Sequence, residues 1–401
     1  MPDEPFRGKW LYAAYSPSLG RSGIDPGPVP RMKQATSEKT VKVGVVGGGF
    51  GRTHILAYRA TPGVEVTAFC QRTKTVADQI AREFGIPHVF TDYREMLAQG
   101  GLDAVSLTTP TNVHLAMASE AFNHSVAVLC EKPLAMNQEE AAEMLKRAEE
   151  AHVIHMTSFN FRFIPAFYRM KELMQQGYVG NRILHVAASW FSERRADPNL
   201  PFGWRDQKEA VGFGAMGDIG VHLVDLVRWL AGDFNRVCSQ QAIFTKERPL
   251  ADGSGKREVT VEDCCVFIGE LTGGGLVSFA ANAAARGNAY QEIRILGNHG
   301  VLRAAVDRTK PDWMIGELWG AQDDGDTQLL PISERLREDL VPADQRRAPR
   351  EAIFANLTRL LAQSIRTGEQ PSPSFSDGLE AQKVLDAVEK SAQTGSWTPV
   401  N

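Results

Sequence analysis

Three polar side chains recur at helical spacing in an apolar segment near the middle of the chain. Asp218, His222 and Asp225 interrupt the run GDIGVHLVDLVRWLAG, whose other residues are mostly apolar. At about 100° per residue, steps of four and seven return close to the starting direction, so a helix over 218–232 would place all three on one face. A buried polar face needs partners or a chemical task. A histidine between two carboxylates is a candidate proton acceptor, because neutral imidazole is a base near neutral pH.

A glycine-rich turn near residue 50 carries a second chemical possibility. The segment VKVGVVGGGFGRTH places Gly47, Gly49 and Gly51 between a strand-like run and a helix-like run. Glycines at such a turn let backbone N–H groups and the helix N-terminus approach a pyrophosphate, so the pattern predicts dinucleotide binding. A plain glycine turn is the alternative, and Arg52 stands where the usual motif has its third glycine.

The residues after the second strand bear on the choice of cofactor. An NAD-selective fold offers an acidic side chain to the ribose 2′-hydroxyl at this point. This chain instead has Gln71, followed by the cations Arg72 and Lys74. A neutral amide beside two cations tolerates or favours a 2′-phosphate, so we expect NADP or NAD, with a slight preference for NADP. Two solvated surface cations are the alternative.

The composition limits the classes of function. A chain of 401 residues is longer than one compact core usually requires, so two domains are expected. The formal net charge of −4 and the lack of dense Lys/Arg stretches argue against a nucleic-acid partner. No window approaches the roughly 18 uninterrupted apolar residues of a membrane span, and no signal peptide is recognisable. We therefore expect a cytoplasmic protein without a membrane partner.

The cysteines and histidines do not indicate a metal site. The five cysteines are an odd number without C-x-x-C spacing, which predicts reduced structural thiols. The nine histidines show no clustering with cysteines at short ligand spacings. We therefore expect no bound metal.

The order of apolar patterns divides the chain into three parts. Residues 1–39 are rich in Pro, Gly and Ser and predict a flexible N-terminal arm. Over 40–157, strand-like runs alternate with helix-like runs, which indicates βαβ units and a Rossmann domain with a doubly wound parallel sheet. Residues 158–401 are typical of an α+β domain on a large, mostly antiparallel open sheet that binds substrate and forms an oligomer. We expect its last helix, 376–393, to pack back on the Rossmann domain.

Four motifs follow the glycine turn in a fixed order. They are TTPTNVH at 108–114, CEKPLA at 130–135, NFRFIPAFYRMKELMQQGYVG at 160–180 and GFGAMGDIGVHLVD at 212–225. In this order they resemble the Gfo/Idh/MocA family, named after glucose-fructose oxidoreductase, inositol dehydrogenase and rhizopine catabolism. The resemblance covers about residues 41–400. It implies an NAD(P)-dependent oxidoreductase of a sugar or polyol.

The resemblance also assigns roles to individual residues. The lysine of the family's E-K-P motif falls on Lys132, with Glu131 near the nicotinamide ribose and Pro133 in a cis bond. The aspartate and histidine of its D-x-G-x-H motif fall on Asp218 and His222. Oxidation of an alcohol by hydride transfer needs a base for the proton and a cation for the developing alkoxide, so Lys132, Asp218 and His222 are expected to be catalytic. Further cofactor contacts are expected at Phe50, Thr109, Pro110, Asn112, His114 and Arg162.

The loop at 190–207 is the candidate substrate segment. It reads WFSERRADPNLPFGWRDQ and lies between a strand and the candidate catalytic helix, where it could close over a ligand. Its side chains suit a carbohydrate, because tryptophan stacks on a sugar ring and arginine holds hydroxyls or an acidic group. An ordinary charged loop is the alternative. The candidate residues are Trp190, Arg195, Trp204 and Arg205, with Arg194.

Together these patterns predict an oxidoreductase that acts on a ring secondary alcohol of a sugar, sugar acid or cyclitol. Because an open sheet leaves one face uncovered, we also expect a homo-oligomer, either a dimer or a tetramer. One alternative is a redox-neutral NAD-dependent glycosidase that works by transient C3 oxidation and elimination. The other is a non-catalytic NAD(P)-sensing protein, although a sensor has no need of a proton relay.

Overall fold

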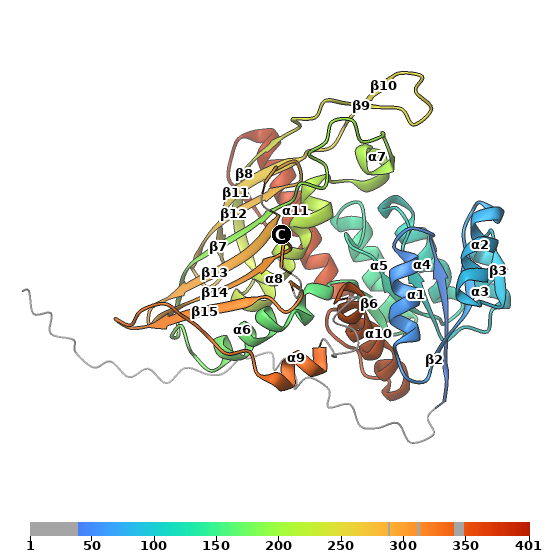
Figure 1. Ribbon diagram of the computed structural model, residues 1–401, viewed down its shortest axis with the longest axis horizontal. Coiled ribbons are helices and arrows are strands. Elements are labelled where there is room, and N and C mark those ends of the chain that lie inside the picture. The colour runs from blue at the N-terminus through green and yellow to red at the C-terminus, as the bar shows by residue number, and fades with distance from the viewer. Residues whose placement is uncertain (1–38, 288, 311–312, 341–348) are drawn as a thin grey trace, which may run out of the picture. The chain divides into compact units, whose positions relative to one another are not determined.

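The computed structural model describes residues 39–287, 289–310, 313–340 and 349–401 (Figure 1). The predicted arm, residues 1–39, lies outside these ranges apart from Lys39, whose ammonium pairs with Asp103 at 2.9 Å. The described residues form a six-stranded sheet, a nine-stranded sheet and a two-stranded hairpin.

The first domain is built on a parallel sheet, as predicted. Its strands are short runs of β-branched and small apolar residues that are buried on both faces, which favours parallel pairing under helices. The strand order is β3-β2-β1-β4-β5-β6, with β1 beside both β2 and β4. The strands are β1 Val41–Val46, β2 Val64–Cys70, β3 His88–Phe90, β4 Ala104–Leu107, β5 Ala127–Cys130 and β6 His155–Thr157. The helices are α1 Gly51–Arg59, α2 Lys74–Phe84, α3 Tyr93–Gln99, η1 Thr111–Val113, α4 His114–Asn123 and α5 Gln138–Glu150.

The second domain is built on the mostly antiparallel sheet that the alternating runs predicted. Its order is β16-β15-β14-β13-β7-β12-β11-β8-β17, and β7 pairs in parallel with β12. Inward side chains of these strands alternate with outward ones, which leaves one face open. The strands are β7 Ile183–Phe191, β8 Phe234–Ala242, β11 Cys264–Leu271, β12 Leu276–Asn282, β13 Tyr290–Gly297, β14 Gly300–Asp307, β15 Glu317–Gln322, β16 Gln328–Leu329 and β17 Thr398–Pro399, with the hairpin β9 Glu247–Pro249 and β10 Lys256–Glu258.

Helices cover the face of this sheet that is turned toward the Rossmann domain (Figure 1). In α8 the apolar residues that surround His222 pack on β7 and β13. The second-domain helices are η2 Asn160–Phe163, α6 Pro165–Gln175, η3 Trp204–Asp206, α7 Lys208–Val211, the π-helical η4 Met216–Gly220, α8 Val221–Ala231, α9 Glu334–Leu340, α10 Pro349–Thr367 and α11 Phe375–Thr394.

Two C-terminal helices join the core of the first domain. Phe354 of α10 is buried in one apolar cluster with Ile55 and Tyr58 of α1. Phe375 of α11 packs edge-on against Phe122 of α4 with ring centroids 6.1 Å apart, and α11 also lies against β8. The contact of α10 with α1 had not been predicted. The two helices therefore hold the C-terminal part of the chain against the first domain.

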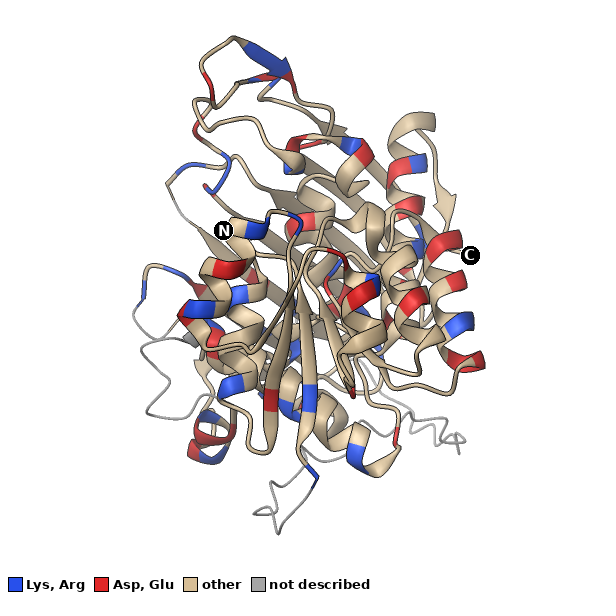
Figure 2. Cartoon of the chain, turned by 90° about the vertical axis from the view of Figure 1, so that its right-hand side faces the viewer, with Lys and Arg blue, Asp and Glu red and all other residues tan. Residues whose placement is uncertain are grey.

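Charged residues lie mostly on the surface of the molecule, and its most apolar helical segment is buried. On the Rossmann side of the molecule, Lys and Arg are interspersed with Asp and Glu over the helices (Figure 2). The segment Lys208–Ala231 is long and apolar enough to cross a membrane by composition alone, but 83% of its most apolar window is buried inside the fold. This segment is therefore part of the protein core, where it positions Asp218 and His222.

Candidate active site

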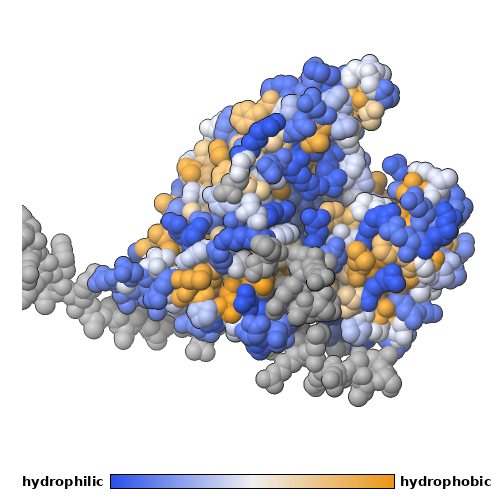
Figure 3. All heavy atoms as spheres, in the orientation of Figure 1, coloured by the Kyte–Doolittle hydropathy of each residue, from blue (hydrophilic) through white to orange (hydrophobic). Residues whose placement is uncertain are grey.

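A pocket of about 810 Å³ lies between the two domains, at the carboxyl ends of β1, β4 and β5. Its second-domain wall comes from η2, the end of β7, the loop 192–207, η4 and α8. In Figure 3 the surface is hollowed between the domains, and the residues around the hollow are mostly hydrophilic. The carboxyl ends of parallel strands, at the point where the strand order reverses, are where doubly wound sheets bind dinucleotides.

The glycine turn after β1 leaves open backbone at one end of this pocket. Gly47 has a φ of +109°, which favours glycine, and a Cβ there would lie 2.7 Å from the carbonyl oxygen of Thr108. Gly49 and Phe50 line the pocket, and a Cβ at Gly49 would meet nothing within 4 Å. The turn and the start of α1 therefore present accessible backbone N–H groups, which fits the pyrophosphate of a dinucleotide.

The carboxyl end of β2 forms the adjoining wall. Gln71 and Arg72 both line the pocket. Lys74 instead pairs with Asp78 one turn along α2, at 2.6 Å, and lies outside the pocket. One of the two predicted cations therefore reaches the cofactor end.

A buried hydrogen-bond chain supports Glu131 at the end of β5. Its Oε1 is 2.9 Å from His54 Nε2, and His54 Nδ1 is 3.1 Å from Ser106 Oγ, which lies 2.7 Å from Tyr58 OH. Although burial raises the pKa of Glu131, the hydrogen bond with His54 and the charge of Lys132 hold this pKa below its usual value. Glu131 is therefore an ionised carboxylate held in one orientation.

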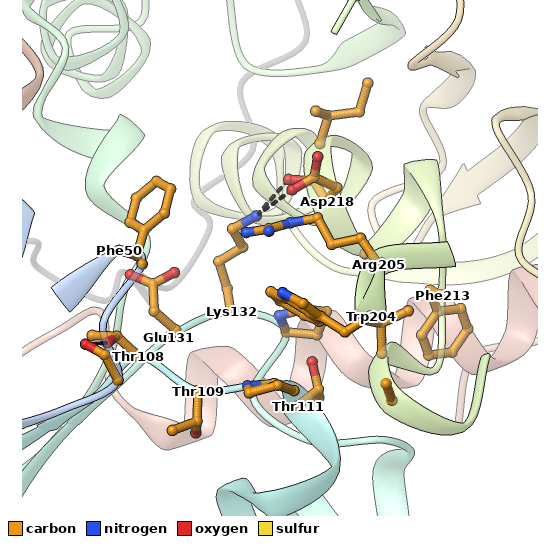
Figure 4. A pocket seen from close by; sticks show the side chains of 18 of the residues that line it. Phe50, Thr108, Thr109, Thr111, Glu131, Lys132, Trp204, Arg205, Phe213 and Asp218 are labelled. Carbon is orange, nitrogen blue, oxygen red and sulfur yellow. Dashed lines mark hydrogen bonds and ion pairs between the residues drawn. The ribbon is translucent and has the colours of Figure 1, made fainter. Parts of the chain in front are cut away.

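Lys132 and Asp218 form an ion pair in the pocket. Lys132 Nζ lies 3.6 Å from Asp218 Oδ1 and donates to the Asp218 backbone carbonyl, and Arg194 Nη1 lies 3.7 Å from Oδ2. Figure 4 shows Lys132 and Arg205 directed toward Asp218. Although burial raises the pKa of Asp218, the neighbouring cations lower it to about 2. Burial lowers the pKa of Lys132, and Asp218 and Glu131 offset part of that effect, so Lys132 releases a proton more readily than a solvated lysine.

His222 lines the same pocket and is held by aromatic packing. Its ring stacks on that of Phe161 with centroids 4.3 Å apart, and its Nδ1 is buried without a hydrogen-bond partner in the described part of the chain. Burial, followed by the charge of Lys132, lowers the pKa of His222 well below its usual value. The ring is therefore neutral near pH 7, in the form that accepts a proton.

Asp218 lies in the π-helical turn η4, directly before α8. The carboxylate of Glu262 accepts hydrogen bonds from the N–H groups of Gly214 and Met216, both at 2.9 Å, and so fixes the start of this turn. π-Helical turns are rare and occur mostly at functional sites. The segment 218–232 is thus not the uniform α-helix that the sequence periodicity predicted.

A buried carboxylate fixes the candidate substrate loop. Asp206 is 2% exposed, binds Arg195 and lies 3.0 Å from Arg248 Nε. Arg248 also donates to two backbone carbonyls of the loop, at 2.7 and 2.8 Å. The guanidinium of Arg195, a predicted substrate ligand, is therefore engaged in holding the loop.

Two stacked tryptophan–arginine pairs complete the second-domain wall. Arg205 lies 4.1 Å from the ring centroid of Trp204, and Arg308 lies 5.0 Å from that of Trp190. Trp190 is 4% exposed and its ring centroid is 5.9 Å from that of His222, whereas Trp204 is 38% exposed. Trp204 is therefore the more accessible of the two for stacking on a ligand.

Comparison with known proteins agrees with this architecture. Residues 41–159 match an oxidoreductase family model with an NAD-binding Rossmann fold, and residues 167–303 match the GFO/IDH/MocA C-terminal domain. The chain belongs to the Gfo/Idh/MocA family. The expected family and its two-domain fold are confirmed.

Curated relatives match almost the whole of this Gfo/Idh/MocA chain. Levoglucosan dehydrogenase of Pseudarthrobacter phenanthrenivorans is 29% identical over 394 residues, which cover 90% of this chain and 98% of that protein. D-apiose dehydrogenase of Paraburkholderia graminis is 25% identical over 367 residues, covering 90% of each. A solved structure of levoglucosan dehydrogenase with NADH and levoglucosan superposes with a TM-score of 0.82 at 29% identity, covering 90% of this chain and 99% of that one.

Most residues that the sequence assigned to the site line the pocket. The Lys132–Pro133 bond is cis, as the family resemblance implies. Asn112 Nδ2 also donates to the carbonyl of Glu209 at 3.1 Å, which connects the two domains beside the pocket. The predicted residues that line it are Gly47, Gly49, Phe50, Gln71, Arg72, Thr109, Pro110, Asn112, Glu131, Lys132, Trp190, Arg195, Trp204, Arg205, Asp218 and His222.

Two predicted cofactor residues lie beside the pocket rather than in its lining. Gly51 faces the sheet, where a Cβ would come within 3.2 Å of Thr108 Oγ1. His114 is buried, and its ring nitrogens lie 3.1 Å from the carbonyls of Leu134 and Thr109. These residues hold the loops that follow β4 and β5.

Arg162, also predicted at the cofactor, instead forms a buried cluster outside the pocket lining. Its Nε donates to Asp225 at 2.9 Å, and its terminal nitrogens donate to Asp377 and Ser372 at 2.7 and 2.8 Å. Asp225 therefore does not share the pocket with Asp218 and His222, because its carboxylate is directed to Arg162. This cluster joins α8 to the start of α11 below the candidate catalytic residues.

Other lining residues escaped prediction because no local motif marks them. Arg248 anchors the loop, and the ring centroid of Phe354 lies 5.8 Å from that of Phe50. Arg308 follows β14 and reaches the pocket only through the pairing of β14 with β13 and of β13 with β7. Their positions depend on tertiary packing rather than on sequence spacing.

Proposed function

We propose that this chain is an NAD(P)-dependent dehydrogenase that oxidises a ring secondary alcohol of a sugar, sugar acid or cyclitol, or reduces the matching ketone. The observation that carries the proposal is the Lys132–Asp218 ion pair beside a neutral His222, in a pocket that also contains a glycine turn. The similarity to levoglucosan dehydrogenase and D-apiose dehydrogenase over about nine-tenths of the chain supports a carbohydrate substrate.

Lys132, His222 and Asp218 have different roles in the transfer of the hydroxyl proton. The ammonium of Lys132 contacts the substrate oxygen and stabilises negative charge as it develops. His222 accepts the hydroxyl proton, since its ring is neutral. Asp218 holds Lys132 in position and keeps it charged. When bound, the nicotinamide supplies hydride-accepting chemistry.

We further propose how the cofactor is held. Gly47, Gly49 and the start of α1 take the pyrophosphate, and Glu131 takes the nicotinamide ribose. Gln71 and Arg72 face the adenosine ribose, where the guanidinium favours the 2′-phosphate of NADP. Both NAD and NADP are expected to bind, with a slight preference for NADP.

A two-channel assay tests the function. Purified protein is incubated with NAD or NADP and a panel of sugars, sugar acids, inositols and aryl glycosides, while reduced-nicotinamide absorbance and aglycone release are followed together. A dehydrogenase produces reduced cofactor without releasing an aglycone. Aglycone release without net reduction would instead indicate the redox-neutral glycosidase, and cofactor binding with neither signal would support the sensor.

We also propose a homo-oligomer formed through the open face of the nine-stranded sheet. Val266, Ile268 and Leu276 on β11 and β12 are 46%, 53% and 54% exposed on this face. Apolar side chains gathered on one sheet face are typical of a subunit interface. Sedimentation should give a dimer or tetramer that Ile268→Lys dissociates and the remote Val76→Lys does not. A monomeric parent protein would contradict the proposal.

A further inference from the structure

The second-domain side of the pocket carries more cations than its carboxylates neutralise. Asp206 binds Arg195 and Arg248, and Asp218 lies between Lys132 and Arg194. Among the further arginines that line the same space, two stack on tryptophan rings, and their guanidinium groups form no hydrogen bond or ion pair with another described residue. These two are Arg205 and Arg308.

Arg308 is held as a fixed donor. Its guanidinium lies between two rings, 5.0 Å from the centroid of Trp190 and 4.8 Å from that of Trp313. Its Nε is buried and has no hydrogen-bond partner among the described residues. A buried donor without a partner is costly, and arginine is suited to planar, bidentate recognition of carboxylate, phosphate and related anions. No described residue supplies that partner, so the site favours an anionic ligand.

The surroundings keep this site positive. Burial, followed by the charges of Arg350 and Arg194, lowers the pKa of Arg308 to about 10, so it remains a cation near pH 7. Arg194 is 54% exposed and already shares Asp218 with Lys132, which leaves its other nitrogens available. An anion bound here would be attracted by several charges at once.

We propose that the substrate is a sugar bearing an anionic substituent, which Arg308 binds with the help of Arg194 and Arg205. This inference rests on the proposed function and specifies its substrate class. The Trp190 ring centroid lies 5.0 Å from the guanidinium of Arg308 and 5.9 Å from the ring centroid of His222, so the anionic group and the reacting hydroxyl belong to one sugar unit. Levoglucosan, the ligand named for the similar solved structure, carries no such group.

Equilibrium binding to the NADH-loaded full-length protein tests the proposal without requiring turnover. Calorimetry compares D-glucuronate and D-galacturonate with their amides, which have nearly the same size and shape as the acids but carry no charge. Glucose 6-phosphate and 6-deoxy-6-sulfoglucose, each against glucose, distinguish phosphate and sulfonate from carboxylate. We expect at least one anion to bind about 10- to 100-fold more tightly than its neutral partner, the range of a charge-assisted hydrogen bond.

Two variants test whether Arg308 causes the preference for an anion over its neutral partner. Arg308→Gln should abolish the preference for the anion while binding NADH normally. Arg303→Gln is the matched control, since Arg303 lies on β14 with its guanidinium 4.5 Å from the ring centroid of Trp319, outside the pocket, and should keep the preference. Should Arg308→Gln fail to bind NADH, Arg308→Lys replaces it and should reduce the preference.

The outcomes separate this inference from the proposed function. Anions that bind no better than their neutral partners, or not at all, overturn the inference, as does an unchanged preference in the Arg308 variant. Selective anion binding with no cofactor reduction by any panel member would count against the dehydrogenase and leave the inference standing.

Discussion

Replacing Asp218 by asparagine removes the negative charge from the candidate site while keeping the size of the side chain. The carboxylate lies 3.6 Å from Lys132 Nζ and 3.7 Å from Arg194 Nη1. Although burial raises its pKa, these and neighbouring cations lower it from 3.8 to about 2. At about 1.4 kcal/mol per pH unit, this corresponds to a net attraction on the order of 2 kcal/mol.

The cations lose at least this much attraction when the charge is removed, because the net value already includes the opposing effect of burial on Asp218. Lys132 is the largest contributor, and Asp218 raises the pKa of both Lys132 and His222. In the proposed mechanism activity requires protonated Lys132 and neutral His222, so both limbs of the pH profile of kcat/KM should move to lower pH in Asp218→Asn. If about half of the 2 kcal/mol falls on Lys132, the alkaline limb moves by about 0.7 pH unit, and kcat/KM beyond that limb falls about fivefold.

The assay is steady-state kcat/KM from about pH 5 to about pH 10 with the best substrate of the panel. Asp252→Asn, in the exposed turn between β9 and β10, makes the same change of charge away from the pocket and should leave both limbs in place. An alkaline limb that stays at its original pH, or moves to higher pH, in Asp218→Asn would refute the dependence of Lys132 on this carboxylate.

Three further predictions follow from charged contacts around the site. Asp206→Ala leaves the buried guanidinium of Arg248 without its carboxylate, and urea titration should show a loss of about 3 to 5 kcal/mol in unfolding free energy. Arg72→Ala should raise the KM for NADP about tenfold and leave that for NAD nearly unchanged. Arg162 lowers the pKa of Asp377 to about 2 although burial raises it, so this carboxylate stabilises the fold above about pH 4 and the contribution is lost as the pH falls toward 2. Asp377→Asn should remove that part of the acid dependence of unfolding.

Matched variants control these experiments. Asp252→Ala should leave the unfolding free energy nearly unchanged, and Arg82→Ala, exposed on α2, should leave the KM for NADP unchanged. A fold as stable in Asp206→Ala as in the parent chain would show that the loop does not depend on Asp206. If Arg72→Ala raises the KM for both cofactors equally, Arg72 does not contact the 2′-phosphate. If the acid unfolding transition is unchanged in Asp377→Asn, the pairing of Asp377 with Arg162 does not stabilise the fold.

The parallel sheet and the cofactor end of the pocket could be predicted because their signals are local. Short buried strands alternate with amphipathic helices, and parallel pairing brings the carboxyl ends of β1, β4 and β5 together. Gly47, Gln71 and Lys132 each follow such a strand closely, so sequence position fixed their place in the fold. The family resemblance then indicated that Lys132, Asp218 and His222 belong to one catalytic site.

What could not be predicted depends on which surfaces pack together. Helical periodicity gives the direction of a side chain on its own helix but not the partner it meets. Asp225 was expected on one face with Asp218 and His222, and Arg162 was expected near the cofactor, but the two pair with each other outside the pocket lining. The π-helical turn at Asp218 is held by Glu262, which is distant in sequence. Arg308 likewise enters the pocket through strand register in the second sheet. No local pattern contains this information.

The measurement that tests the account most directly is the separation of cofactor binding from hydride transfer in Lys132→Met. NADH affinity is measured by fluorescence titration, and reduced-nicotinamide formation is followed with the best substrate, beside the control Lys146→Met on the exposed face of α5. The account predicts that Lys132→Met binds NADH within about threefold of the parent protein and loses about 10³-fold in kcat, the range of general acid–base and electrostatic effects. Turnover by Lys132→Met within about tenfold of the parent rate would contradict the account.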